Sequence, residues 1–411
     1  MNDVLTLEPP GGDVEIAPGI SPEILRLVRG PRVIGELRGP QEGATLLVVG
    51  SLHGNEPSGA LALDRVFGRL ETAGLQEVRG RMVGLLGNRQ ALARRRRFLQ
   101  HDLNRFWNVE RVERLLRRDG PLEAEAEELR ELGLEIERLL REGQGRPVYL
   151  LDLHTTSGDG TAFANLEDTL ANRRFGLEFP VTVVVGIEEQ LGGTLANYLF
   201  ERGVVTLGFE AGQHDDPTSV DRAEAAIWIA LEAAGVLPRG SRDEVAAARR
   251  LLQVNRGKQP HVVEVRHRQA VWPGSGFVMR PGYRNFQVVR ADEVLAHDAR
   301  GEIRAAETSR ILMPLYQEQG EDGFFLVRPV RRFWLDLSSW LRQHRIERYL
   351  HLFPGVRAVP GEPDEPERFT VDRRYARWLS LELFHLLGFR RRRELGRYLM
   401  MARRPYDEPS S

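Results

Sequence analysis

The stretch that decides the fold reads Thr45-Leu46-Leu47-Val48-Val49-Gly50-Ser51-Leu52-His53-Gly54-Asn55-Glu56-Pro57. Its first six residues are mostly apolar at successive positions, which is typical of a strand buried on both faces of a parallel sheet. A helical pattern then runs from Pro57 to Leu70, and proline suits the first turn of a helix. Because ligands of α/β proteins collect at the carboxyl ends of strands, the polar residues between strand and helix are candidates for a functional site.

The same alternation continues through the first two-thirds of the chain. Further strands are predicted at Arg81–Leu86, Val148–Leu153, Val181–Gly186 and Val204–Phe209, and further helices at Leu122–Arg141 and Ser219–Ala234. Strands that alternate with helices predict an α/β/α sandwich with a mostly parallel sheet.

The pattern changes after about residue 257. His261–Arg268 alternates apolar and polar residues, and turns rich in Gly and Pro follow, which predicts a small all-β module up to Val330. The last stretch has helical patterns at Trp334–Leu350 and Tyr375–Leu387 and an arginine cluster at Arg390–Arg393. We therefore expect an α/β domain over residues 1–256, a small β domain over 257–330 and a helical, Arg-rich extension over 331–411.

Composition excludes several classes of partner and site. The chain has 58 Lys+Arg and 59 Asp+Glu, so its net charge of -1 does not indicate a binder of nucleic acid or membranes. It has no cysteine, so any zinc must be held by His, Asp or Glu. There is no signal-peptide pattern and no run near the roughly 18 apolar residues of a membrane span. We expect a cytoplasmic protein with no nucleic-acid or membrane partner.

Two strand ends carry residues that could hold a metal. His53 and Glu56 are three residues apart after one predicted strand, and His154, about 100 residues further on, ends another. Two His and one Glu with an open position for water form a known zinc arrangement. Alone, His-x-x-Glu is more often a surface loop and a single His more often structural. Two such placements at strand ends of one sheet favour a shared metal.

Two further segments could supply chemistry. Glu210 follows the strand Val204–Phe209 and, beside a metal, would be placed to take a proton from the bound water. Asn104 and Arg105 offer amide and guanidinium donors that match a carboxylate. The alternatives are a capping or surface Glu and a solvated loop.

Taken together, four segments resemble the succinylglutamate desuccinylase/aspartoacylase family, within the wider zinc carboxypeptidase clan. They are His53-Gly54-Asn55-Glu56, Arg97-x-x-x-x-Asp102-Leu103-Asn104-Arg105, Asp152-Leu153-His154-x-Thr156-Ser157 and Glu210-x-Gly212. The resemblance covers about Ala44–Gly212 well and Gly257–Val330 loosely, and the family pattern has no counterpart for residues 331–411. It implies a zinc-carboxypeptidase-like sandwich with a small C-terminal β domain.

The resemblance also implies the metal and the catalytic groups. One zinc ion per chain would be held by His53, Glu56 and His154. Glu210 would be the general base and acid, and Arg97 would polarise the scissile carbonyl.

For substrate binding, the resemblance assigns Asn104 and Arg105 to a substrate carboxylate. Tyr198 and Arg202 stand in a Tyr-x-x-x-Arg spacing similar to further substrate contacts of the family, although their distance to Glu210 is shorter here. A helix surface explains this last pair equally well.

These residues predict a zinc-dependent hydrolase that cleaves the amide (acyl) bond of a small carboxylate-bearing substrate, such as an N-acyl amino acid. A carboxypeptidase or an ester hydrolase would use the same site. A non-enzymatic binding protein on this fold would have lost a ligand or the catalytic Glu, and all are present. A polyanion-binding adaptor acting through the Arg-rich tail is a further alternative. We expect the large apolar residues of the tail to pack against the rest of the protein or against a second copy in a homo-oligomer.

Overall fold

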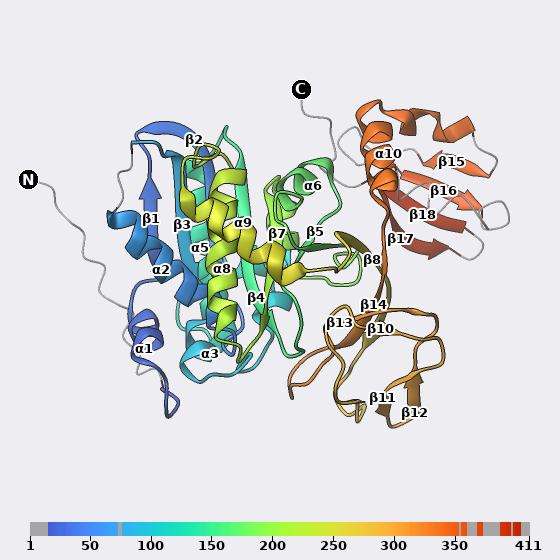
Figure 1. Cartoon of the computed structure of the whole chain (residues 1–411), viewed down its shortest axis with the longest axis horizontal. Coiled ribbons are helices and arrows are strands. Elements are labelled where there is room, and N and C mark those ends of the chain that lie inside the picture. The colour runs from blue at the N-terminus through green and yellow to red at the C-terminus, as the bar shows by residue number, and fades with distance from the viewer. Residues whose placement is uncertain are drawn as a thin grey trace, which may run out of the picture.

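The computed structural model of the chain describes residues 15–72, 76–352, 355–359, 368–372, 387–395 and 398–403. Figure 1 shows an α/β body in the amino-terminal part, a β module below its far end and a smaller lobe formed by the last described residues. No helix in these ranges combines the length and the apolar character that crossing a membrane would require.

The main sheet has eleven strands. In spatial order they are β1 (Val33–Arg38), β3 (Arg79–Leu86), β2 (Gln41–Gly50), β4 (Val148–Thr156), β7 (Val205–Gln213), β5 (Phe163–Leu166), β6 (Thr182–Val185), β8 (Val262–Ala270), β14 (Asp322–Pro329), β13 (Ser309–Leu312) and β10 (Val288–Val289). Strands β3, β2, β4 and β7 are mutually parallel, whereas β1 and β5 join this group as antiparallel neighbours. All five predicted strands are present with slightly shifted ends, and the α/β sandwich is confirmed.

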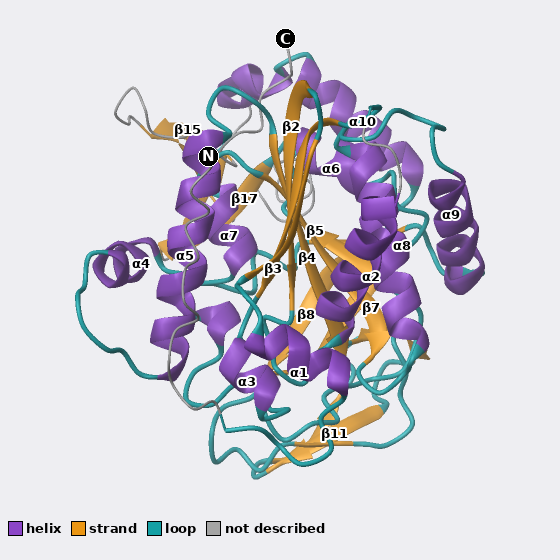
Figure 2. Ribbon diagram, turned by 90° about the vertical axis from the view of Figure 1, so that its left-hand side faces the viewer, coloured by secondary structure: helices purple, strands orange, loops and turns teal. Residues whose placement is uncertain are grey.

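Helices cover both faces of this sheet, as Figure 2 shows. One face packs against α2 (Ser58–Thr72), α8 (Thr218–Ala233) and α9 (Asp243–Arg256), and the other against α4 (Val109–Leu116), α5 (Ala124–Glu142) and α7 (Leu195–Phe200). Successive residues of a strand point to opposite faces. Leu46 and Val48 of β2 therefore join the first core, and Leu47 and Val49 join the second.

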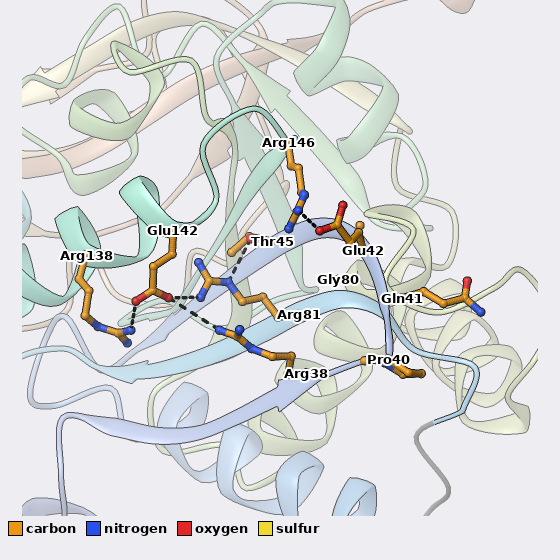
Figure 3. Close-up of a pocket in the computed structure, with 12 residues that line it drawn as sticks. Arg38, Pro40, Gln41, Glu42, Thr45, Gly80, Arg81, Arg138, Glu142 and Arg146 are labelled. Atoms are coloured by element: carbon orange, nitrogen blue, oxygen red, sulfur yellow. Dashed lines mark hydrogen bonds and ion pairs between the residues drawn. The ribbon is translucent and has the colours of Figure 1, made fainter. Parts of the chain in front are cut away.

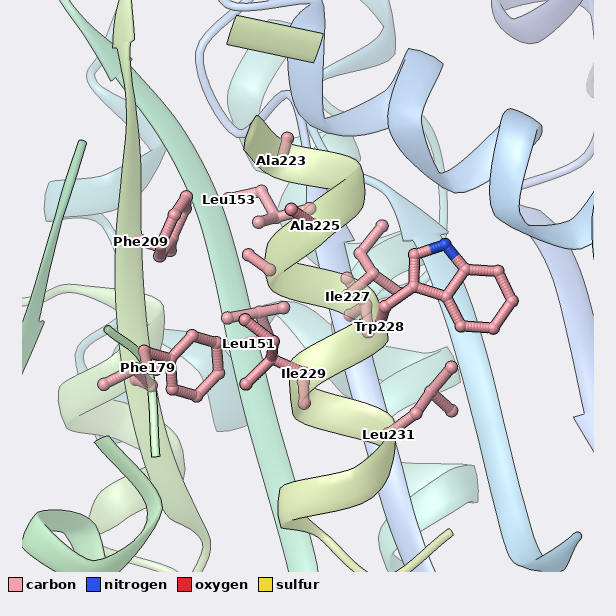
Figure 4. Packing of buried hydrophobic residues seen from close by; sticks show 14 of the residues in the cluster. Leu151, Leu153, Phe179, Phe209, Ala223, Ala225, Ile227, Trp228, Ile229 and Leu231 are labelled. Carbon is pink, nitrogen blue, oxygen red and sulfur yellow. The ribbon is translucent and has the colours of Figure 1, made fainter. Parts of the chain in front are cut away.

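The first of these cores is the larger one, and Figure 4 shows its centre around α8 and β4. Ile227 and Ile229 of α8 are fully buried with Leu151 and Leu153 of β4 and Phe209 of β7. Full burial of one such side chain contributes about 1.5–3 kcal/mol. This packing fixes β4 and β7 side by side, which matters because both strands carry candidate site residues at their carboxyl ends.

Shorter helices complete the body. They are α1 (Pro22–Arg29), α3 (Arg89–Ala93), α6 (Leu170–Gly176) and the 3-10 turn η1 (Leu103–Arg105). Helices α1 and α3 share a small core with Ala60 of α2 and Leu86 of β3.

The stretch from residue 258 to 330 consists of strands and turns, as predicted for a β module. Strands β9 (Val278–Met279), β11 (Val294–Asp298) and β12 (Gly301–Arg304) form a separate three-stranded sheet. Strand β8 pairs in parallel with β6 of the body and antiparallel with β14. The main sheet therefore continues from the α/β body into the β module.

The C-terminal extension contains helices, as predicted, and also a sheet that the prediction lacked. Helix α10 (Arg332–Gln343) and the 3-10 helix η2 (Ile346–Leu352) correspond to the predicted Trp334–Leu350 helix. The predicted helix Tyr375–Leu387 lies outside the described residues except for Leu387. The added sheet consists of β15 (Val356–Val359), β16 (Arg368–Asp372), β18 (Tyr398–Arg403) and β17 (Phe389–Leu395).

The arginine cluster Arg390–Arg393 lies on the edge strand β17 of this sheet. The strands were missed because each is short, so alternation is hard to detect. In β16 the alternation is present at Phe369 and Val371, and both side chains are buried in one cluster with Met401 of β18.

The extension contacts the body through charged groups. Arg342 of α10 is 1% exposed and donates to the Asp168 carbonyl at 2.8 Å and to its carboxylate at 2.9 Å. Arg173 of α6 binds the same carboxylate at 2.9 Å. By contrast, Phe333 and Trp340 of α10 remain 65% and 50% exposed. These two aromatic residues are therefore mostly exposed in this chain, and their packing against a second copy stays a prediction.

Candidate metal centre and active site

A sharp turn after β2 points His53 and Glu56 back toward the sheet. Ser51 adopts a φ of 62°, and its hydroxyl donates to the Glu56 carbonyl at 3.0 Å, which closes the loop. Gly54 sits so close to α3 that a Cβ there would lie 2.0 Å from the carbonyl carbon of Ala91. This contact explains why the segment needs glycine between its two polar residues.

The structure brings His53, Glu56 and His154 together. Their ligand atoms lie within 4.8 Å of one another, and all three side chains are buried. The Nδ1 of His53 is 2.9 Å from Glu56 Oε1, and the Nδ1 of His154 is 3.0 Å from Glu56 Oε2. Strands β2 and β4 are paired so that Gly50 stands opposite Leu153, which sets the loop of one beside the end of the other.

Two aspartates hold the other ring nitrogen of each histidine. Asp102 Oδ1 is 3.0 Å from His53 Nε2, and Asp152 Oδ2 is 3.0 Å from His154 Nε2. Histidines that bind a metal usually donate their second N–H to a carboxylate, which fixes the ring. Sequence reasoning quoted both aspartates in its motifs but gave them no role. The signal for Asp152 is its spacing of two from His154 on a strand, which places both on one face.

The charges of this group support a cation site. Burial alone would raise the pKa of Glu56, but the charges and hydrogen bonds of His53 and His154 lower it well below its usual range. Burial disfavours a charged His154, yet Asp152 and Glu56 outweigh it and raise the pKa of His154 well above its usual range. The His154 imidazole thus holds positive charge against these carboxylates, and a divalent cation can replace its proton. The clustered ligand atoms and the two supporting aspartates fit zinc.

Glu210 lies beside this group on the neighbouring strand. It is the register partner of His154, so both side chains leave the same face of the sheet. Glu210 is 6% exposed, and its Oε2 atom is buried without a hydrogen-bond partner among the described residues. Burial raises its pKa to about 8, although His154 and Arg97 act in the opposite direction. A carboxyl group that exchanges a proton near neutral pH next to a metal group is a candidate general acid and base.

Arg97 also reaches the group. Its Nη2 and Nε donate to Asp102 Oδ2 at 3.0 and 3.2 Å, and its Nη1 is 3.4 Å from Glu56 Oε1. The guanidinium is thereby held next to the ligand atoms by the same aspartate that holds His53.

Asn104 and Arg105 follow on η1, and the structure places Asn104 at the metal group. Its Oδ1 accepts from the Leu195 N–H at 2.9 Å, so its Nδ2 faces His154 Nε2 at 3.2 Å. Arg105 turns toward the β module, where its Nη2 donates to Asp322 Oδ2 at 2.8 Å.

Asp322 binds a second arginine as well, since Arg268 Nε donates to its Oδ1 at 2.5 Å. Two guanidinium groups thus share the Asp322 carboxylate, and Glu321 Oε2 lies 3.8 Å from Arg105 Nε as a second ion-pair partner. The Nε of Arg105 is buried and has no hydrogen-bond partner among the described residues. A substrate carboxylate could therefore still be bound there. Sequence reasoning missed Asp322, which lies 217 residues from Arg105.

Tyr198 and Arg202 are not brought to this group. The Tyr198 hydroxyl donates to Glu137 Oε1 of α5 at 2.8 Å, and Arg202 stacks 3.6 Å from the Tyr198 ring while pairing with the same glutamate. These contacts pack α7 on α5. These contacts agree with the helix-surface explanation, and the substrate role implied by the resemblance stays a prediction.

The loop between β13 and β14 covers the group from the β module. Gln317 Oε1 accepts from Asn55 Nδ2 at 2.9 Å and lies 3.0 Å from His214 Nε2. The other ring nitrogen of His214 is 2.7 Å from Thr155 Oγ1, next to His154. A pocket of about 410 Å³ beside this loop is lined by Asn55, His214 and Gln317, among others. No local motif signals Gln317, which lies 262 residues from Asn55.

A larger pocket of about 500 Å³ lies at the opposite edge of the sheet, where β2 and β3 begin and α5 ends. Figure 3 shows Arg38, Arg81 and Arg138 gathered around Glu142, and Arg146 paired with Glu42. Each of these arginines has a carboxylate partner within the protein. No metal-ligand atoms of the described residues converge at this larger pocket. We therefore place the active site at the opposite edge of the sheet, where the smaller pocket lies.

Residues 42–222 match the succinylglutamate desuccinylase/aspartoacylase catalytic domain. The matched range holds all three metal-site residues, Glu210 and Arg97. The resemblance of the four segments to this family of deacylases is therefore confirmed over residues 42–222.

Solved structures agree on the fold. The chain is similar to a succinylglutamate desuccinylase/aspartoacylase from Rhodobacter sphaeroides, with 18% identity, a TM-score of 0.51 and coverage of 72% of this chain and 88% of that chain. It is also similar to the product-bound ectoine utilization protein EutE (DoeB) from Ruegeria pomeroyi, with 18% identity, a TM-score of 0.52 and coverage of 71% and 86%. A succinylglutamate desuccinylase from Vibrio parahaemolyticus matches with 15% identity, a TM-score of 0.51 and coverage of 75% and 95%.

Proposed function

We propose that this protein is a zinc-dependent hydrolase that cleaves the amide (acyl) bond of a small carboxylate-bearing substrate, such as an N-acyl amino acid. One observation carries the proposal. The buried His53, Glu56 and His154 converge on one point, and the unpartnered carboxyl oxygen of Glu210 lies beside them. Most buried polar atoms in proteins have a hydrogen-bond partner, so an unpartnered carboxyl oxygen beside a cluster of ligand atoms supports a reactive role.

The three ligand residues would hold one zinc ion per chain, because two His and one Glu leave a coordination position open. When bound, zinc supplies a water of lowered pKa and a Lewis acid for the substrate carbonyl. Asp102 and Asp152 keep the two imidazoles in the orientation that presents Nδ1 to the centre.

The protein's own groups account for the proton transfers. Glu210 accepts a proton from the attacking water and returns it to the leaving amine, which matches a carboxyl group whose pKa is raised to about 8 before metal binds. Arg97, held by Asp102, donates to the carbonyl oxygen as negative charge develops on it. Loss of one such donor typically lowers the rate by about 10²–10³-fold.

Arg105 and Asn104 would bind the substrate carboxylate. The guanidinium has five N–H donors, and Asp322 and the Asn104 carbonyl each take one. The remaining donors, including the buried Nε, can bind a carboxylate.

A substrate screen tests this function. Zinc-loaded protein is assayed against N-acyl amino acids, their C-terminal amides, matched esters and short peptides. We expect hydrolysis of the N-acyl amino acids that stops on chelation and returns with zinc. Conversion of the carboxylate to a neutral amide should weaken binding by about 2–5 kcal/mol, because a charged donor is left unpaired.

Arg105→Ala should remove most of this preference. Equal kcat/KM for acid and amide with the wild-type protein would contradict the carboxylate site. Faster turnover of esters or peptides would identify the site as an ester hydrolase or a carboxypeptidase instead.

A further inference from the structure

The segment from Arg97 to Asp102 carries two functional side chains but has no helix or strand of its own. Arg97 reaches Glu56, and Asp102 holds His53, so the position of this loop sets the geometry of both groups. A loop without regular structure must have its backbone groups satisfied from elsewhere. One such bond runs from the Gly54 N–H to the Arg97 carbonyl.

A single buried carboxylate on α5 satisfies the middle of the loop. Glu125 is 1% exposed, and its Oε1 accepts from the Leu99 N–H at 2.6 Å. Its Oε2 accepts from the N–H groups of Gln100 and His101 at 3.0 and 3.2 Å. The Asn88 amide donates to Oε1 at 3.1 Å. Three successive backbone amides of the loop therefore bind one carboxylate, and bonds to a charged acceptor are the strong kind.

The same helix offers a matched control one turn further on. Glu128 is 3% exposed and accepts from the N–H groups of Arg89 and Gln90 at 3.1 and 3.0 Å. It also pairs with Arg32 at 2.8 Å. Glu128 thus resembles Glu125 in burial and in bonding, but it holds the start of α3 rather than the loop at the metal group.

We propose that Glu125 is a positioning residue for the hydrolysis proposed above, on which this inference rests. By fixing the amides of Leu99, Gln100 and His101, Glu125 sets where Asp102 meets His53 and where Arg97 meets the reacting carbonyl. Its loss lets the loop move without removing any group that touches metal or substrate. The effect is therefore on zinc affinity and on kcat, with little effect on KM.

Glu125→Gln and Glu128→Gln test the proposal. The first change places an NH₂ donor where backbone amides donate, so part of the loop loses its acceptor. Zinc affinity is measured by competition with a chelator at fixed pH, kcat and KM on a substrate from the screen, and thermal unfolding on both variants. We expect Glu125→Gln to weaken zinc binding by about 10–100-fold, the range seen when a group supporting a metal ligand is lost, and to lower kcat.

Glu128→Gln should lower the melting temperature at least as much and leave zinc affinity and kcat unchanged. Wild-type zinc affinity and kcat in folded Glu125→Gln would overturn the proposal, as would equal losses in both variants. If Glu125→Gln does not fold, Glu125→Asp, which keeps the charge but is shorter by one methylene group, gives the same test. A wild-type protein that binds zinc but cleaves no acyl substrate contradicts the proposed function, and the zinc measurement still decides the role of Glu125.

Discussion

The two edges of the main sheet both gather charged side chains, but they differ in what is left unsatisfied. At the edge where β2 and β3 begin, Glu142 is shared by Arg38, Arg81 and Arg138, and each arginine has a carboxylate partner. At the opposite edge, Glu210 keeps a buried oxygen without a partner, next to histidines that face one point. The comparison teaches that convergence and an unsatisfied group, rather than pocket size or charge count, distinguish a reactive site from a structural ion-pair cluster.

The largest effect should come from removing a metal ligand. We expect His154→Ala to lose most of its zinc and its hydrolytic activity, because only His53 and Glu56 remain to hold the ion. Elemental analysis of the washed protein measures the metal, and circular dichroism verifies the fold. One zinc per chain in this variant would show that the metal is bound elsewhere.

The next effect concerns Glu210. Glu210→Gln should keep zinc and substrate binding but lower kcat by about 10²–10⁴-fold, the usual range for loss of general acid and base help. Steady-state kinetics with a verified substrate, together with a metal analysis, checks both parts. Near-normal turnover would rule out the proton-transfer role.

A smaller effect is expected on the stability of the metal-free protein as pH changes. Burial raises the pKa of Glu210 to about 8 from an ordinary value of 4.5. Between these values the unfolded state has lost the proton while the folded state keeps it, so rising pH removes stability by up to about 1.4 kcal/mol per unit. Below pH 4.5 the carboxyl group is protonated in both states and has no effect.

Glu210→Gln lacks this titration. The melting temperature of Glu210→Gln minus that of the metal-free wild type should therefore increase as pH rises from 5 to 9. Parallel curves for the two proteins would contradict the raised pKa.

The smallest effect is expected at the opposite edge. Glu142 is 38% exposed, so Glu142→Gln should lower stability by about 1 kcal/mol or less, as for other surface ion pairs. Zinc affinity and kcat should not change. If zinc affinity or kcat falls in Glu142→Gln as it does when a residue of the metal group is changed, the two charged clusters are coupled. The Glu142 cluster would then not be purely structural.

Sequence patterns predicted the buried centre of the fold better than its margins. Strands β2, β3, β4 and β7 are buried on both faces and therefore show continuous apolar runs. The short strands β1 and β5, and the short strands of the extension, were missed. Helix Ser219–Ala234 was predicted almost to the residue, since α8 spans Thr218–Ala233.

Motif spacing also predicted which residues meet at the metal group. His53 and Glu56 follow β2 and His154 lies near the carboxyl end of β4, and parallel strands bring such ends to one edge. Asp102 and Asp152 were quoted in the motifs, yet their role depends on which ring nitrogen they face, and this orientation is not encoded in spacing.

The sequence by itself determined the fold class, the residues of the metal group and the kinds of atom that could bind a cation. Only the tertiary structure decided which charged groups are already paired. Asp322 reaches Arg105 across 217 residues, and Tyr198 turns to Glu137 on α5 rather than to the metal group. The physical reason is that ligand placement at strand ends follows from local periodicity, whereas pairing between distant segments depends on sheet register and helix packing. Burial and satisfaction of polar groups exist only once those segments have met.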